Sequence, residues 1–230
     1  MSEKRIIIAI DGPAGAGKST IARRIADRLG FIYINTGAIY RAVALWAIRL
    51  EIDLNDMYRL EQLAKAAQIE FAGRDGRISL NSEDVTEAIR HPRIAEASSK
   101  VSAVPGVRRA LLAIQRQVAE HNSVVMEGRD IGSVVFPNAQ VKIFLDADPK
   151  ERTQRRAREL EQEGQGADLQ TVSGELRQRD ERDRRRPESP LVQAPDAELV
   201  DTTALSLDQV EEAVLRVIRA RISNGKGARI

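Results

Sequence analysis

Short apolar runs alternate with stretches of helical period along this chain. Residues 5–10 are apolar and β-branched, which predicts a buried strand, and residues 20–29 have the helical period up to a stop at Gly30. Buried strands are also predicted at 31–34, 124–127, 141–145 and 198–200, and helices at 37–50, 107–120 and about 207–222. Ser206 and Gln209 are expected to form a capping box before the last helix. The alternation predicts an α/β fold, a five-stranded parallel sheet between two helical layers, with ligands beyond the carboxyl ends of the strands.

Two segments depart from this alternation. Residues 69–71 and 77–80 are short alternating runs around Gly73-Arg74-Asp75-Gly76, which predicts a β-hairpin in a small antiparallel insertion. Residues 149–190 form a charged helical stretch that Glu163-Gly164-Gln165-Gly166 interrupts, as a hinge or as an ordinary turn between two helices. The tail at 223–230 is expected to fray.

A glycine-rich segment links the first predicted strand to the first predicted helix. Gly12 to Ser19 fits G-x-x-x-x-G-K-[ST], the P-loop pattern, in which backbone N–H groups and a helix N-terminus surround phosphate oxygens. Lys18 is expected to reach the β- and γ-phosphates of a nucleoside triphosphate, and the Ser19 hydroxyl to bind Mg²⁺. A glycine turn that matches by chance is the alternative, which the flanking strand and helix disfavour. The residues expected to bind ATP are Gly12, Pro13, Ala14, Gly15, Ala16, Gly17, Lys18, Ser19 and Thr20.

The composition narrows the classes of function. With 230 residues, 42% of them hydrophobic and 30% charged, the chain is expected to form one globular domain over 1–230. It contains no cysteine and only two histidines, which argues against disulfides and zinc chemistry. Neither a secretory signal nor a run of about 18 apolar residues is found, so no membrane partner and a cytoplasmic location are expected.

Arginines gather in three places outside the glycine-rich loop, where phosphoryl transfer would need fixed positive charge. Arg41 follows Thr36 in the second predicted helix, and Arg129-Asp130 follows the strand at 124–127. Six arginines and three acids lie within 177–186, an excess of positive charge that suits a lid over triphosphate. The alternatives are solvated helical arginines for Arg41 and 177–186, and an internal salt bridge for Arg129 and Asp130. No aromatic residue lies within 150–190, which favours a small polyanion over a nucleic acid strand.

Four sequence motifs resemble those of the bacterial cytidylate kinases, a family of P-loop nucleoside monophosphate kinases. They are Gly-Pro-Ala-Gly-Ala-Gly-Lys-Ser-Thr, Thr-Gly-Ala-Ile-Tyr-Arg, Glu-Gly-Arg-Asp-Ile-Gly-Ser-Val-Val-Phe-Pro and Arg-Asp-Glu-Arg-Asp-Arg-Arg-Arg, and the resemblance extends over residues 5–222. It implies transfer of the γ-phosphoryl group of ATP to CMP or dCMP with Mg²⁺. It also implies a CORE sheet, a nucleoside monophosphate (NMP)-binding region near 36–106 that includes the hairpin, and a helical LID near 150–190.

The same resemblance assigns roles to individual residues. It implies that Thr36, which stands where the family commonly has serine, and Arg41 hold the CMP phosphate, together with Arg129. It implies that Ser99, Arg108 and Asp130 recognise cytosine, and that Asp183 contacts the ribose. Arg179 is also implied in ribose contact, and Arg186 is a nucleotide-binding LID arginine. Lys18, Arg129, Arg179 and Arg186 would stabilise the charge on the moving phosphoryl group. No general base is assigned; Asp130 is only a candidate.

Other classes of function stay open at this point. Another small-molecule P-loop kinase, acting on UMP, shikimate or gluconate, is the nearest alternative. A nucleotide switch would carry Asn-Lys-x-Asp, which the sequence lacks, and a nucleic-acid-stimulated NTPase is disfavoured by the aromatic-poor basic segment. A non-enzymatic binding module is disfavoured because Lys18 and Ser19 are intact. Small nucleotides are therefore the expected partners, with no nucleic acid, and a monomer is expected.

Overall fold

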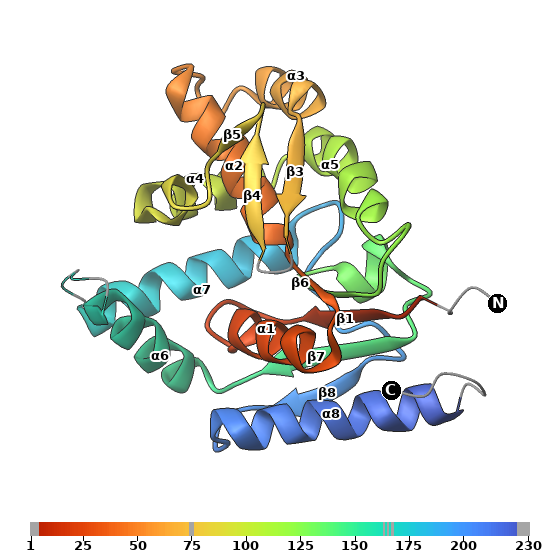
Figure 1. The fold of residues 1–230 in the computed structure, drawn as a ribbon. Helices are drawn as coiled ribbons and strands as arrows, with labels where there is room; N and C mark the ends of the chain where they lie inside the picture. Colours follow the sequence, from red (N-terminus) through yellow and green to blue (C-terminus); the bar gives the residue numbers. More distant parts are fainter. Residues whose placement is uncertain (1–4, 74–75, 163, 165, 167, 225–230) are drawn as a thin grey trace.

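A parallel sheet lies at the centre of the computed structural model, which describes residues 5–73, 76–162, 164, 166 and 168–224 (Figure 1). Its five strands have the order β2-β6-β1-β7-β8, and every neighbouring pair is parallel. The strands are β1 (Ile7–Asp11), β2 (Ile32–Asn35), β6 (Val124–Gly128), β7 (Val141–Asp146) and β8 (Glu198–Asp201). The predicted five-stranded parallel sheet is confirmed, with strand ends displaced by one or two residues.

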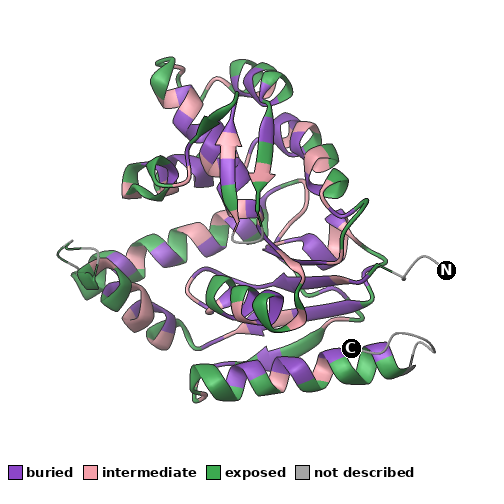
Figure 2. Cartoon of the chain, in the orientation of Figure 1, coloured by how far each residue is buried: buried purple, intermediate pink, exposed green. Residues whose placement is uncertain are grey.

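Helices cover both faces of this sheet, and their buried sides face it (Figure 2). On one face, α1 (Lys18–Leu29) and α8 (Leu207–Asn224) pack their apolar side chains against β1 and β7. Ser206 and Gln209 exchange hydrogen bonds at the start of α8, and Gly30 ends α1 in the left-handed conformation, as predicted. On the other face, Leu112 of α5 (Pro105–Gln117) packs near Ile34 and Met126.

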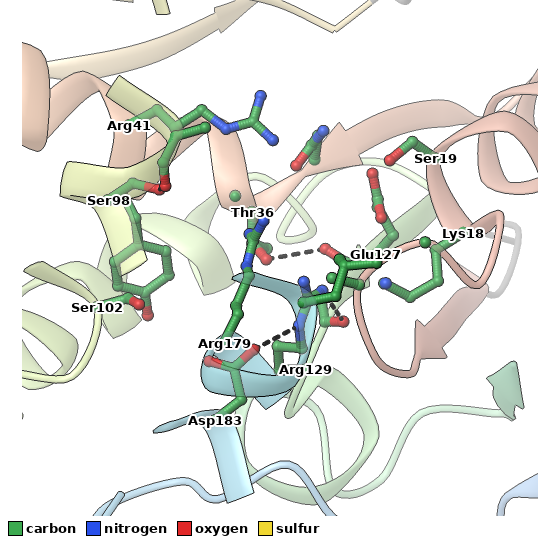
Figure 3. A pocket seen from close by; sticks show the side chains of 18 of the residues that line it. Lys18, Ser19, Thr36, Arg41, Ser98, Ser102, Glu127, Arg129, Arg179 and Asp183 are labelled. Carbon is green, nitrogen blue, oxygen red and sulfur yellow. Dashed lines mark hydrogen bonds and ion pairs between the residues drawn. The ribbon is translucent and has the colours of Figure 1, made fainter. Parts of the chain in front are cut away.

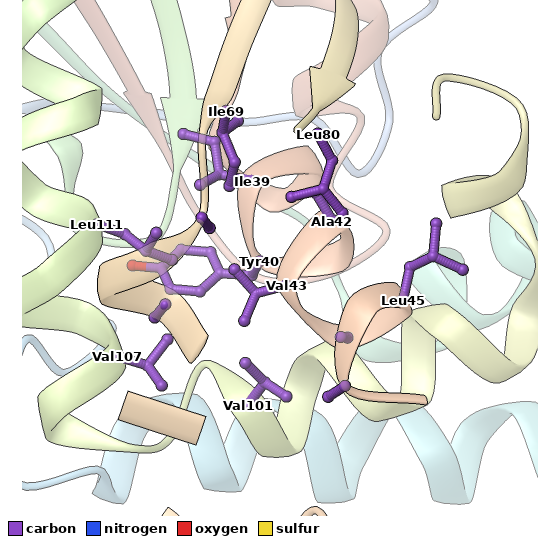
Figure 4. Close-up of a cluster of buried hydrophobic side chains, with 14 of the residues drawn as sticks. Ile39, Tyr40, Ala42, Val43, Leu45, Ile69, Leu80, Val101, Val107 and Leu111 are labelled. Carbon is purple, nitrogen blue, oxygen red and sulfur yellow. The ribbon is translucent and has the colours of Figure 1, made fainter. Parts of the chain in front are cut away.

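A second core lies beside the sheet and is built mostly from helices. It contains α2 (Thr36–Arg49), α3 (Met57–Ala66), α4 (Pro92–Val101) and α5, with the short 3₁₀ helix η1 (Ala88–Arg90). Figure 4 shows Tyr40 of α2 among Val43, Val101, Val107 and Leu111. The periodicity did not identify α3 or α4. The helix predicted at 107–120 begins earlier, because Pro105 occupies its first turn.

An antiparallel sheet covers this second core. Its strands β3 (Ile69–Ala72), β4 (Arg77–Leu80) and β5 (Glu83–Asp84) pair in that order, which confirms the small β insertion and adds a third strand. Of the predicted hairpin turn, residues 74–75 lie outside the described residues.

The charged stretch forms two helices, α6 (Pro149–Gln162) and α7 (Leu169–Arg185), which project to one side of the sheet (Figure 1). Gly164 lies between them with φ of 73°, whereas residues 163 and 165 of the predicted interruption lie outside the described residues. So does most of the tail expected to fray, since α8 extends to Asn224 and residues 225–230 are not described. Within the described residues, no helix is long and apolar enough to span a membrane.

Candidate active site

A pocket of about 260 Å³ lies at the carboxyl ends of β1, β2 and β6, where the sheet topology places ligands. The register aligns these ends, since Asp11 of β1 pairs with Gly128 of β6 and Asn35 of β2 pairs with Glu127. Figure 3 shows Lys18 and Ser19 on one side, Arg41, Ser98 and Ser102 on the opposite side, and Arg129, Arg179 and Asp183 below. Segments distant in sequence therefore meet in one concave site.

The glycine-rich loop forms the wall near α1. Gly12 has φ of 148°, and a Cβ there would lie 2.0 Å from the backbone oxygen of Leu145, so only glycine fits. Six of the residues expected to bind ATP line the pocket: Ala14, Gly15, Gly17, Lys18, Ser19 and Thr20. Gly12, Pro13 and Ala16 are buried behind them and shape the loop without lining the pocket.

Lys18 is buried at the start of α1, and its ammonium group donates to the carbonyl of Pro13 at 2.6 Å. Burial, and after it the nearby charge of Arg129, lowers the pKa of this lysine to about 7. The negative charge of a polyanion in the pocket would oppose this lowering of the pKa and favour the protonated ammonium group. Lys18 is therefore placed to gain its full positive charge when a polyanion binds.

Three arginines gather where the pocket meets α2, β6 and α7. The Nε of Arg41 is buried without a hydrogen-bond partner, and Arg179 forms no hydrogen bond or ion pair with the described residues. Burial and the charge of Arg129 lower the pKa of Arg179 to about 10. Arg129 itself donates from Nε to Asp183 at 2.9 Å and from Nη1 to the carbonyl of Gly128 at 3.1 Å. Incompletely neutralised guanidinium groups of this kind favour an anion, above all a phosphate.

A second set of charges is neutralised within the protein. Arg108 Nη2 lies 2.5 Å from Asp130 Oδ2 and its guanidinium carbon lies 5.2 Å from the centre of the Tyr40 ring. Arg186 lies 3.6 Å from both Asp130 and Asp183, too far for a good hydrogen bond. Arg129 and Asp130 do not pair with each other, but each forms an internal salt bridge with another element, Arg129 with Asp183 and Asp130 with Arg108.

The predicted hydroxyl residues differ in where they lie. Thr36 begins α2 within the pocket and its Oγ1 donates to the carbonyl of Glu127 at 2.8 Å. Ser99 is buried in α4, its hydroxyl has no hydrogen-bond partner in the described part of the chain, and it does not line the pocket. Ser98 of α4 and Ser102, which caps the C-terminus of this helix, line it instead. All other residues predicted to bind CMP line the pocket: Arg41, Arg108, Arg129, Asp130, Arg179, Asp183 and Arg186.

Two buried acids at the strand ends, Asp11 and Glu127, were given no role by the sequence patterns. Asp11 accepts the N–H groups of Ile131 and Gly132 at 2.8 and 2.7 Å, which anchors the π-helical turn that follows Asp130. Burial raises the pKa of Asp11 to about 6, against the lowering effect of those two bonds. Glu127 lines the pocket and accepts from the Tyr33 hydroxyl at 2.9 Å. Both follow apolar strand residues directly, and an acid at that position is the signal that could have found them.

Comparison with known proteins gives a consistent result. The sequence model of the family described as Cytidylate kinase matches residues 8–220. The cytidylate kinase of Solibacter usitatus is 57% identical over 226 residues, which cover 97% of each chain, and that of Syntrophotalea carbinolica is 49% identical over 95% of this chain and 94% of its own. A solved structure from Eubacterium ventriosum, 14% identical, shares the fold with a TM-score of 0.53 over 94% of this chain and 99% of that one. The glycine-rich loop, the arginine clusters and these full-length similarities agree that the chain belongs to the cytidylate kinase family.

Proposed function

We propose that this protein transfers the γ-phosphoryl group of ATP to CMP or dCMP, giving ADP and CDP or dCDP. Membership of the family supports the reaction. The observation that carries the proposal for this chain is the pocket itself, in which the phosphate-binding loop and the Arg41, Arg129 and Arg179 group share one cavity. A donor triphosphate and an acceptor monophosphate can thus meet there.

The donor occupies the side formed by the loop and α1. Backbone N–H groups of the loop and the N-terminus of α1 surround its phosphates, and Lys18 turns from the Pro13 carbonyl to the β- and γ-phosphates. The oxygen atoms available at this side of the pocket also fit Mg²⁺. Exposed Ser19 and the Glu127 carboxylate line the same pocket, and Mg²⁺ prefers oxygen ligands. Bound Mg²⁺ would neutralise charge on the phosphate oxygens, and Ser19 is the residue proposed to hold it.

The acceptor occupies the opposite side. Arg41, Arg129 and Arg179 are proposed to bind its phosphate, a role supported by their incompletely neutralised charge. Asp183 is proposed to bind the ribose, with Arg179. Asp130 and Arg108 are proposed to read the base, and Arg186 to bind the nucleotide as an arginine of the LID. Thr36 lies at the phosphate end, and Ser99 lies on α4 behind the pocket wall.

The chemical step needs positioning more than proton transfer. A phosphate oxygen of CMP attacks the γ-phosphorus, the bond from that phosphorus to the β–γ bridging oxygen breaks, and ADP leaves with the electron pair. The attacking phosphate is largely ionised at neutral pH, since its second pKa is near 6, so no general base is required. Lys18, Arg129, Arg179 and Arg186 stabilise the charge that spreads over the transferred group.

The remaining proposals concern the setting of the reaction. We assign α6 and α7, within about 150–190, as the LID, whose closure would exclude water, and about 36–106 as the NMP-binding region. We also propose that the enzyme acts as a monomer. The proposed substrates are nucleotides of the cytoplasm, where we place the enzyme.

An acceptor panel tests the proposal. ADP release is followed by a coupled assay with CMP, dCMP, UMP, AMP and GMP at equal concentration, with and without added RNA or DNA. We expect CMP and dCMP to be fastest, with no stimulation by nucleic acid. Faster turnover of AMP or GMP would refute the specificity, and stimulation by nucleic acid would favour the nucleic-acid-dependent NTPase class.

A further inference from the structure

One buried ion pair lies outside the pocket, at the place where the LID helices meet the phosphate-binding loop. Arg152 is in the first turn of α6 and Asp180 is in α7, and their side chains are only 6% and 5% exposed. Neither residue lines the pocket. The proposed function therefore leaves both without a role.

The pair is hydrogen-bonded to the loop as well as to itself. Arg152 Nη1 donates to Asp180 Oδ2 at 2.6 Å and to the carbonyl of Ala14 at 3.0 Å, while Nε donates to the carbonyl of Ala147 at 3.1 Å. The N–H of Ala14 points to Asp180 Oδ1 at 3.4 Å. Both backbone groups of one loop residue thus face the same buried pair.

Packing reinforces these bonds at the same place. Ala14 belongs to a small apolar cluster with Val172 and Leu176 of α7, beside Leu160 of α6. A Cβ at Gly15 would lie 3.0 Å from the backbone oxygen of Arg152 and 3.1 Å from its Cβ, so the first turn of α6 lies directly on the loop. The loop and the two helices form one packed junction.

We propose that Arg152 and Asp180 are a positioning pair that fixes the phosphate-binding loop to the base of the LID, so that ATP binding depends on this junction. The proposal rests on the proposed function, because it assigns α6 and α7 to the LID. Replacing a buried ion pair by apolar residues is often neutral for stability, so stability alone gives no reason for these charges. The hydrogen bonds from the pair to Ala14 give such a reason, because the loop binds phosphate through its backbone geometry.

The junction also sets where two pocket arginines point. Arg179 precedes Asp180 on α7 and Arg156 lies one turn after Arg152 on α6, and both arginines line the pocket. Because neighbouring helical residues have fixed angular relations, seating Asp180 and Arg152 on Ala14 directs Arg179 and Arg156 toward the phosphates. The pair acts through these groups without touching the substrate.

The double variant Arg152→Met/Asp180→Val tests the pair, because it replaces both charged side chains by apolar ones of roughly similar total volume and removes the bonds to the loop. We expect the dissociation constant for ATP, measured by titration calorimetry, to rise about tenfold or more, which corresponds to the loss of one or two hydrogen bonds. The KM for CMP should change by less than the constant for ATP, and Tm should stay within about 4 °C of wild type. Asp180→Asn, which keeps the shape and one acceptor, should give an intermediate constant. Glu181→Gln is the matched control, because exposed Glu181 pairs with Arg185 alone among the described residues and the change should leave ATP binding unchanged.

The binding constants and the Tm values together support or overturn the proposed positioning role. Unchanged ATP binding in the double variant overturns the proposal, and so does an equal loss of ATP and CMP binding with a large fall in Tm, which would make the pair merely structural. Selective loss of ATP binding with partial recovery in Asp180→Asn supports it. ATP binding is measured without CMP, so a wild-type protein that fails to phosphorylate CMP would refute the proposed function and leave this test valid.

Discussion

Asp183 carries a negative charge that faces three arginines in the pocket, and Asp183→Ala removes that charge. The carboxylate lies 2.9 Å from Arg129 and 3.6 Å from Arg186, and only 6% of the residue is exposed. Arg179 is close enough to influence its pKa. The variant leaves three cations together without the acid between them, so both folding and acceptor binding should suffer.

The expected size follows from burial and charge. Removing one partner of a buried pair costs about 3–5 kcal/mol, and the partial exposure of Arg129 favours the lower figure. For a chain of this length about 3 kcal/mol lowers Tm by about 6–12 °C, at about 2–4 °C per kcal/mol. If Asp183 also accepts a ribose hydroxyl, the KM for CMP should rise about tenfold to a hundredfold, the effect of losing one charge-assisted hydrogen bond. The KM for ATP should change less.

The effect on stability should depend on pH in a defined direction. Burial by itself raises the pKa of Asp183, but Arg129, Arg179 and Arg186 outweigh it and hold the pKa below the usual value. A carboxyl with a depressed pKa stabilises the fold fully above its unfolded pKa of about 4, and this contribution disappears as the pH falls through the folded pKa. The difference in unfolding free energy between wild type and Asp183→Ala should therefore be complete at pH 7 and shrink below about pH 4.

Denaturant unfolding at several pH values, with steady-state kinetics at pH 7, measures both parts. Glu181→Gln serves as the control, since it removes an exposed charge two residues away on the same helix. A loss of stability below about 1 kcal/mol would refute the electrostatic reasoning. An unchanged KM for CMP would remove Asp183 from the acceptor site.

Arg129→Lys should lower kcat about tenfold or more, because lysine cannot fork between Asp183 and a phosphate; an unchanged rate with CMP would remove Arg129 from the site. Lys18, with its pKa lowered to about 7 by burial and by Arg129, should take up most of a proton when ATP binds at pH 8, because the phosphates favour its charged form. Calorimetry in two buffers of different ionisation enthalpy measures that uptake, and equal heats would contradict it. Excess EDTA should abolish phosphoryl transfer, because the reaction is proposed to need Mg²⁺. It should leave the Tm of the nucleotide-free protein unchanged, since no cluster of metal-binding acids or histidines occurs in the described part of the chain. A large fall in Tm would instead point to a structural metal.

Local periodicity was enough to predict the central sheet but not its boundaries. The strand predicted at 5–10 is Ile7–Asp11, because pairing with β6 and β7 decides which residues enter the ladder. β5 is only two residues long and forms because Glu83–Asp84 pair with the free edge of β4. No pattern within these two residues predicts that pairing. α3 and α4 are short helices stabilised by the second core, so tertiary packing determines them more than their own sequence does.

The sequence predicted most of the residues that line the pocket but not all of the contacts between them. Ser99 matches a family position implied in cytosine recognition but lies buried behind the pocket wall. A helix turns about 100° per residue, so Ser98 of α4 and Ser102, the residue that ends this helix, line the pocket instead. Asp11 carries no motif beyond its place before Gly12. Its role depends on the turn after Asp130, more than a hundred residues away.

The sequence by itself determined the phosphate-binding loop, because a G-x-x-x-x-G-K-[ST] segment between a strand and a helix encodes its own backbone geometry. It also determined that many arginines are present. Only the tertiary structure decided which of them stay available for a ligand. Arg108 and Arg152 are neutralised by Asp130 and Asp180, whereas Arg41 and Arg179 have no such partner within the described residues. An ion pair requires a few ångströms between charges, and the fold alone sets that separation for residues 22 and 28 positions apart.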